Sequence, residues 1–130
     1  AGLDTNYFAF ADIDAVFDYY TPVIIANNDL IDSDPATVRA FMDATRAGYE
    51  DCIKDPDGAA EILLEAAPEL ETELVHASQV YLADQYQAEA SSWGEIDPAR
   101  WDAFFSWVSE QGFAPKIEPG AGMTTEFMGA

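Results

Sequence analysis

Two short apolar segments near the N-terminus have the pattern of strands that are buried on both faces. Residues 7–10 are aromatic apart from one alanine, and residues 20–26 are rich in β-branched side chains. Short continuous apolar runs without alternation are typical of strands that are covered on two sides. Pro22 lies near the start of the second segment, where a strand tolerates proline. The N-terminal part of the chain therefore predicts two strands.

After Asn28 the apolar spacing changes to that of helices, and an Asp-Pro pair marks the start of three of them. The pairs are Asp34-Pro35, Asp55-Pro56 and Asp97-Pro98. An Asp carboxylate accepts a hydrogen bond from a free amide of the first turn, and a proline at the first helical position has no amide to leave unpaired. We therefore predict helices that begin at the three prolines.

Four amphipathic helices are expected, over residues 35–53, 56–67, 71–86 and 98–112. Residues 113–130, rich in Gly and Pro, are expected to be irregular. Apolar residues three and four positions apart share one helix face. The predicted buried face of the first helix is Val38, Phe41, Met42, Thr45, Tyr49 and Cys52, and that of the second is Ala59, Ile62, Leu63 and Ala66. The predicted buried face of the third helix is Leu74, Val75, Ser78, Tyr81 and Leu82, and that of the fourth is Trp101, Phe104, Phe105 and Val108.

This order of elements predicts a helix-rich α/β fold that is not self-sufficient. A sheet of only two strands is marginal, and its open edges need a partner. We therefore expect either that further strands lie upstream in a larger protein, or that two copies of the chain exchange elements in a homodimer.

The charge of the chain limits its partners. It has 25 acidic and 5 basic residues, for a net charge of −20. Such a surface repels the phosphates of nucleic acids and anionic lipid headgroups, so we exclude nucleic-acid binding. The acidity favours solubility, and it is also the pattern of adaptation to salt, where ions screen the repulsion. No apolar run is long enough to predict a membrane-spanning helix, and no signal peptide is visible at the start.

The reactive side chains do not predict an active site or a metal centre. The chain has one histidine, His76, and one cysteine, Cys52, which is too few for a zinc site. Asp29, Asp32 and Asp34 resemble part of a calcium site, but the glycine and closing glutamate of an EF-hand loop are missing. The sequence therefore predicts no catalytic residue, no metal and no cofactor, and the chain is not expected to be an enzyme.

Aromatic residues next to a carboxylate are the candidates for ligand binding. Tyr19 and Tyr20 follow Asp18 at the junction of the two predicted strands. An aromatic ring stacks on a flat heterocycle, and a carboxylate accepts hydrogen bonds from an amino group. The alternative is that one tyrosine packs in the core and the other faces solvent. Trp93, Trp101 and Trp107 are interpreted as packing residues.

Several segments share their order with one known family. The stretch from Phe10-Ala11-Asp12 to Asp18-Tyr19-Tyr20-Thr21-Pro22-Val23-Ile24-Ile25 is followed by residues 34–41, 44–49, 55–56, 66–70, 77–82, 93–94, 101, 104–112 and 125–127. In this order the chain resembles the thiamine pyrimidine precursor-binding proteins, which are related to the pyrimidine synthases of yeast thiamine biosynthesis. The resemblance covers nearly the whole chain.

The resemblance implies the C-terminal part of a two-lobed periplasmic-binding-protein fold of the second type. Residues 1–11 would form the last strand of the second lobe, residues 12–20 the hinge crossover, and residues 21–130 a strand and helices that complete the first lobe. The implied function is that of the extracytoplasmic substrate-binding component of an ABC importer. It would be periplasmic or lipid-anchored, would bind a small heterocycle such as a thiamine pyrimidine precursor, and would deliver it to a permease. The hinge side would contribute Asp12, Asp18, Tyr19 and Tyr20 to the ligand site.

One departure from the family leaves the ligand open. Relatives often carry Asp-Tyr-Gly where this chain has Asp12-Ile13-Asp14-Ala15, and other relatives bind riboflavin-like, sulfonate or amine solutes. One alternative is a pyrimidine-precursor synthase on the same scaffold, but such enzymes rely on His-rich and Cys-rich sites. Another alternative is a helical interaction module without a small-molecule site.

Overall fold

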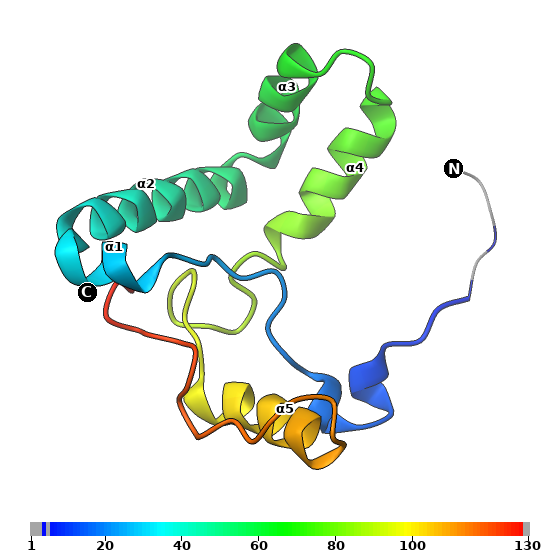
Figure 1. Ribbon diagram of the computed structural model, residues 1–130. Helices are drawn as coiled ribbons and strands as arrows, with labels where there is room; N and C mark the ends of the chain where they lie inside the picture. The colour runs from blue at the N-terminus through cyan, green and yellow to red at the C-terminus, as the bar shows by residue number, and fades with distance from the viewer. Residues whose placement is uncertain (1–3, 5, 129–130) are drawn as a thin grey trace. The chain divides into compact units, whose positions relative to one another are not determined.

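The computed structural model describes residue 4 and residues 6–128, and its regular elements are all helical (Figure 1). Two short 3₁₀ helices come first and five α-helices follow. They are η1 (Phe10–Asp12), η2 (Ala15–Phe17), α1 (Asn28–Ser33), α2 (Pro35–Lys54), α3 (Pro56–Ala66), α4 (Thr72–Ala83) and α5 (Pro98–Glu110). None of these helices is long and apolar enough to cross a membrane.

The chain divides into two compact units. The first, which we call the α2–α4 unit, contains residues 28–95 together with Phe127 and Met128. The second, which we call the α5 unit, contains the described residues up to Asn27 together with residues 96–126. Each unit is described by itself below.

The prediction of an α/β fold is wrong for the described part of the chain, where no strand occurs, while its helix-rich character is confirmed. Residues 7–9 are irregular and lead into η1, and residues 20–27 are irregular as well. A strand needs a neighbouring strand to pair its backbone groups, and the described part of the chain contains no strand that could pair with these segments. In η1 the backbone is satisfied locally, since the amides of Asp12 and Ile13 donate to the carbonyls of Ala9 and Phe10 at 3.1 and 3.0 Å. The assignment of residues 1–11, 12–20 and 21–130 to lobes stays a prediction.

The three helix starts predicted from Asp-Pro pairs are confirmed. In each case an Asp carboxylate oxygen accepts a hydrogen bond from a backbone amide in the first turn. The pairs are Asp34 with Thr37 at 3.1 Å, Asp55 with Gly58 at 3.0 Å, and Asp97 with Ala99 at 2.8 Å. Asp55 is also the residue at which α2 ends, so a single residue separates α2 from α3.

The helical layout differs from the prediction in two places. Helix α1 was not expected, since its six residues are too few to show an apolar period. Helix α4 starts close to the predicted residue but ends at Ala83, three residues earlier than expected. Glu71 caps its start, and the carboxylate accepts from the amides of Glu73 and Leu74 at 3.1 and 2.7 Å.

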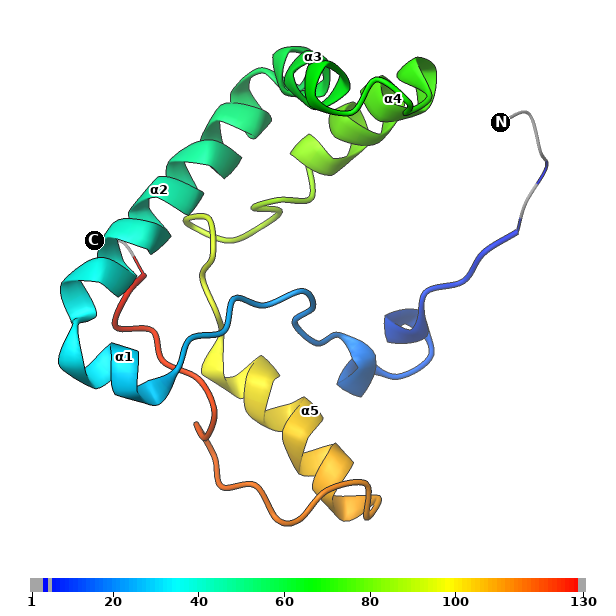
Figure 2. The same cartoon turned by 45° about the horizontal axis from the view of Figure 1, so that its top comes forward.

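In the α2–α4 unit, α3 and α4 run side by side and α2 packs against both (Figures 1 and 2). The predicted face of α3 is wrong by one position. Ala60 is fully buried and Leu64 partly buried, whereas Ile62 is 71% and Leu63 46% exposed. Apolar residues surround much of α3, so their spacing does not define one face.

Five further side chains predicted to be buried are exposed instead, and Tyr81 is 67% exposed. They are Phe41, Ala66, Leu74, Ser78 and Tyr81. This unit has few buried core residues: in addition to Ala60, they are Val38 and Phe127. Arg39 lies 5.4 Å from the centre of the Phe127 ring.

The α5 unit is held together by aromatic rings. Trp107 contacts Phe17 edge-on at 5.2 Å between ring centres, and Phe104 and Phe113 at 6.1 and 5.9 Å. The predicted face of α5 is confirmed, with Trp101, Phe104, Phe105 and Val108 all partly buried. The segment after α5 is irregular as expected, and side chains of α5 hold it in place. Trp101 Nε1 donates to the carbonyl of Ala121 at 3.1 Å, and Asp102 Oδ1 accepts from the amide of Gly120 at 2.7 Å.

Candidate ligand-binding residues

Tyr19 uses one face of its ring to pack on α5. Its ring centre lies 4.1 Å from that of Phe104, and the two planes differ by 11°. This is a close parallel stack between two rings of the same unit. The side chain of Tyr19 remains 40% exposed. The stack therefore fixes the orientation of the tyrosine and leaves part of its surface accessible.

Asp18 already has a cationic partner. The guanidinium of Arg100 donates through Nη2 to the Asp18 carboxylate and through Nε to the Asp18 backbone carbonyl, the latter at 2.8 Å. The side chain of Arg100 is 38% exposed, so solvent screens this ion pair in part. Arg100 engages Oδ1 of Asp18, while the side chain of Asp18 is 56% exposed, so the carboxylate keeps further positions that accept hydrogen bonds.

Tyr20 is held at both ends of its side chain. Its hydroxyl oxygen accepts a hydrogen bond from the backbone amide of Asp97 at 2.8 Å. The guanidinium carbon of Arg100 lies 4.4 Å from the centre of its ring, within the range of a cation–π contact. The same arginine therefore contacts both Asp18 and Tyr20.

The structure brings three of the four predicted ligand residues together against the first half of α5. Asp18, Tyr19 and Tyr20 all contact residues of that helix. Asp12 lies on η1 and is exposed. The structure does not bring Asp12 into contact with Asp18, Tyr19 or Tyr20.

Arg100 is the residue that sequence reasoning missed. It is one of only five basic residues, and it is the third residue of α5. A cation in the first turn of a helix is disfavoured by the helix dipole, which is a signal that such a residue has a specific partner. The partner itself, Asp18, is 82 positions away and could not be found from one sequence.

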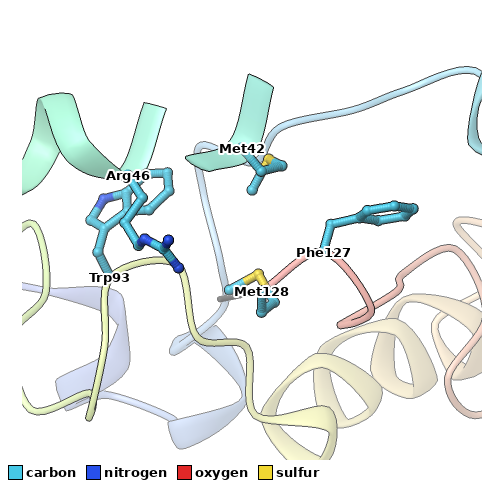
Figure 3. A pocket seen from close by; sticks show the side chains of 5 residues that line it. All are labelled: Met42, Arg46, Trp93, Phe127 and Met128. Atoms are coloured by element: carbon cyan, nitrogen blue, oxygen red, sulfur yellow. The ribbon is translucent and has the colours of Figure 1, made fainter. Parts of the chain in front are cut away.

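A small hollow lies in the α2–α4 unit (Figure 3). It is lined by Met42 and Arg46 of α2, Trp93 of the loop after α4, and Phe127 and Met128 near the C-terminus. Its volume is about 10 Å³, far below the ~300–1,000 Å³ of ordinary ligand pockets. Arg46 is paired with Asp43 at 2.9 Å and with Glu50 at 3.8 Å, so it is not a free charge for a ligand. This hollow does not have the size of a heterocycle site.

His76, Cys52 and Asp34 lie in surroundings that are typical of residues with a structural role. Both ring nitrogens of His76 contact carboxylates of α3, and Cys52 is a partly buried free thiol on α2. Asp34 caps α2, where hydrogen bonds from Thr37 lower the pKa of its carboxyl group. Within the described residues, no group of three or more His, Cys, Asp or Glu side chains is placed to hold a metal ion.

Comparison with known proteins adds the family context. The model of the family described as "NMT1/THI5 like" matches residues 1–59, which include all four candidate residues. The formylaminopyrimidine-binding protein of Halalkalibacterium halodurans is 29% identical over 111 residues. This chain resembles thiamine pyrimidine-binding proteins. The aligned part covers 82% of this chain and 33% of that relative, so the chain spans about one third of the relative's length. The resemblance drawn from the sequence is confirmed.

Proposed function

We propose that this chain is part of the extracytoplasmic substrate-binding component of an ABC importer, and that the complete protein binds a small heterocycle, a thiamine pyrimidine precursor. The observation that carries the proposal is the similarity, over 82% of the chain, to a formylaminopyrimidine-binding protein. The match of the family model to residues 1–59 supports it. A permease is the partner that this function requires. The chain would act in the periplasm or at the outer cell surface.

In this proposal the α5 unit supplies one wall of the ligand site. Tyr19, already stacked on Phe104, offers its remaining exposed surface to a flat ring. The exposed Asp12 and the carboxylate oxygen of Asp18 that Arg100 does not contact would accept hydrogen bonds from an amino group of the ligand. Tyr20 would act by holding Tyr19 in position, since its own hydroxyl and ring already contact Asp97 and Arg100. The opposite wall would come from the rest of the protein, as in a site closed by two lobes.

A synthase on the same scaffold is the rival function, because the family model does not separate the two. Both ring nitrogens of His76 are engaged by Asp57 and Glu61. That histidine is therefore not available as the base of a nucleophile–base pair with Cys52. The arrangement favours a binding protein over an enzyme.

Calorimetric titration of formylaminopyrimidine tests the proposal. We expect the full-length protein to bind it and this chain alone to bind it far more weakly. A site enclosed by two walls buries ~70–90% of its ligand, and each missing hydrogen bond costs about 1 kcal/mol. Three or four missing contacts lower the affinity by about two to three orders of magnitude.

Matched tyrosine variants of the full-length protein locate the site. Tyr19→Leu removes the stacking ring, and we expect it to weaken binding about tenfold, the equivalent of one aromatic stack. Tyr81→Leu changes an exposed tyrosine of α4 and should leave the affinity unchanged. Equal effects of the two changes would show that the site lies elsewhere. Absence of binding by the unchanged full-length protein would reject the pyrimidine as ligand, and micromolar binding by this chain alone would reject the two-wall site.

A further inference from the structure

One histidine carries the only basic side chain in a long acidic stretch. Between Lys54 and Arg100 the chain has no lysine or arginine. The same stretch contains eleven carboxylates, namely Asp55, Asp57, Glu61, Glu65, Glu69, Glu71, Glu73, Asp84, Glu89, Glu95 and Asp97. Helices α3 and α4 lie inside it, so these two packed helices have no permanent positive charge between them. His76 of α4 is the one group there that can become a cation.

The ring of His76 lies between two carboxylates of the neighbouring helix. Its Nδ1 is 2.9 Å from Asp57 Oδ1, and its Nε2 is 3.0 Å from Glu61 Oε1. An ionised carboxylate only accepts hydrogen bonds. Both ring nitrogens must therefore carry a proton for both contacts to be hydrogen bonds, and a ring with two protons is a cation. The geometry thus selects the charged form of His76.

The positive charge of His76 also stabilises its two acidic partners. Asp57 and Glu61 are four residues apart, on the same side of α3, where like charges repel each other. A positive ring between them offsets this repulsion and ties α3 to α4. When the ring is neutral, one contact at least loses its hydrogen and the two carboxylates face each other without a cation.

The electrostatic surroundings favour the charged ring. The hydrogen bond to Asp57, followed by the hydrogen bond and charge of Glu61, raises the pKa of His76 against the opposing effect of partial burial. The groups that raise this pKa are the two carboxylates of α3. Glu73 lies one turn earlier on α4 and carries the same negative charge, so it does not oppose them.

We propose that His76 is a pH-sensitive switch that holds α3 against α4 while its ring carries two protons. Because the pKa of the folded state lies above the ordinary value of 6.5, the link is complete below that pH and is lost as the pH rises through the folded-state value. Above it, the pairing of α3 and α4 loosens. This inference concerns the α2–α4 unit alone and does not depend on the ligand.

Proton NMR of the ring gives the first test, and it needs no variant of the histidine. His76 is the single histidine of the chain, so its ring signals are unambiguous. We expect a titration midpoint above 6.5 in the unchanged chain, and a return to about that value, the ordinary histidine range, in the double variant Asp57→Asn/Glu61→Gln. A midpoint at or below 6.5 in the unchanged chain would overturn the proposal.

Thermal unfolding gives the second test, between about pH 6 and pH 9, where carboxylates stay ionised and Tyr and Lys stay protonated. We expect the melting temperature of the unchanged chain to fall across this range. His76→Lys keeps a positive charge at every pH in this range, so its melting temperature should fall much less. His76→Gln is neutral at every pH, so its melting temperature should also stay nearly constant, but at a lower value. Every other side chain is the same in the three chains, so differences in the fall come from position 76. An undiminished fall in both variants would show that another group is responsible.

Discussion

The α2–α4 unit and the α5 unit are stabilised in different ways. In the α2–α4 unit the helices in contact follow one another along the chain, with α3 packed on α4 and α2 on both, and Phe127 joins them from near the C-terminus. In the α5 unit the hydrogen bonds between Tyr20 and Asp97 and between Asp18 and Arg100 bridge 77 and 82 residues. Both units expose large apolar side chains, and the α5 unit also gathers aromatic rings around one helix.

This difference shows how much chain entropy each unit must offset when its contacts form. Local contacts close small loops and cost little chain entropy, so modest interactions suffice to form them. The α5 unit must bring distant segments together, and it uses large aromatic side chains and an arginine with three contacts to do so. We therefore expect single substitutions to have larger effects on the α5 unit than on the α2–α4 unit.

The largest effect is expected for Trp107→Ala. This change removes contacts with Phe17, Phe104 and Phe113. Large aromatic residues replaced by alanine in a core cost about 3–5 kcal/mol, and because Trp107 is only partly buried we expect about 2–4 kcal/mol. Urea unfolding followed by near-ultraviolet circular dichroism measures the loss. The control is Tyr81→Ala on α4, an exposed aromatic whose removal should stay within about 0.5 kcal/mol. Equal losses for the two would contradict the comparison of the units.

A smaller effect is expected for Arg100→Ala. The change removes two hydrogen bonds to Asp18 and the contact with the ring of Tyr20, and because these groups are partly exposed we expect about 1–2 kcal/mol. Arg100→Lys keeps the charge but not the planar group that reaches both partners, so it should restore little. Lys116→Ala breaks an exposed ion pair with Glu118 and should cost less than about 0.5 kcal/mol. Full rescue by lysine would show that charge alone matters at this position.

The smallest effect is expected at the junction of α2 and α3. Asp55→Ala removes the carboxylate that accepts from the amide of Gly58, and loss of such a cap costs about 1 kcal/mol. Asp55→Asn changes the net charge by the same amount but keeps an oxygen that accepts this bond, so it should be nearly neutral. Chemical denaturation of the two variants compares them directly. If asparagine destabilised the chain as much as alanine, the charge of Asp55 would be its main contribution.

The features that follow from local chemistry could be predicted from the sequence. The Asp-Pro pairs gave three helix starts because the cap and the proline act within one turn. The apolar face of α5 was predicted because its rings stand three and four residues apart. In α3, by contrast, the apolar residues occupy several faces, so their spacing does not show that Ala60 is buried and Ile62 exposed.

The features that depend on distant partners could not be predicted. The β-branched residues of the segment 20–26 favour a strand, but an extended segment becomes a strand only when a neighbour pairs with it. The candidate residues Asp18, Tyr19 and Tyr20 were found from their side chains. Their attachment to Asp97, Arg100 and Phe104 required the structure, because a single sequence does not show which residues meet across about 80 positions.

The tryptophans of the chain are divided between the two units. Trp93 stacks on Tyr49 in the α2–α4 unit, at 4.6 Å between ring centres, while Trp101 and Trp107 belong to α5. Replacing Trp93 by phenylalanine therefore leaves tryptophan fluorescence that originates in the α5 unit alone. Replacing the other two leaves emission from a single indole beside the last turns of α2. The chain thus carries its own optical reporters, with which the opening of each unit is observed separately and without an attached dye.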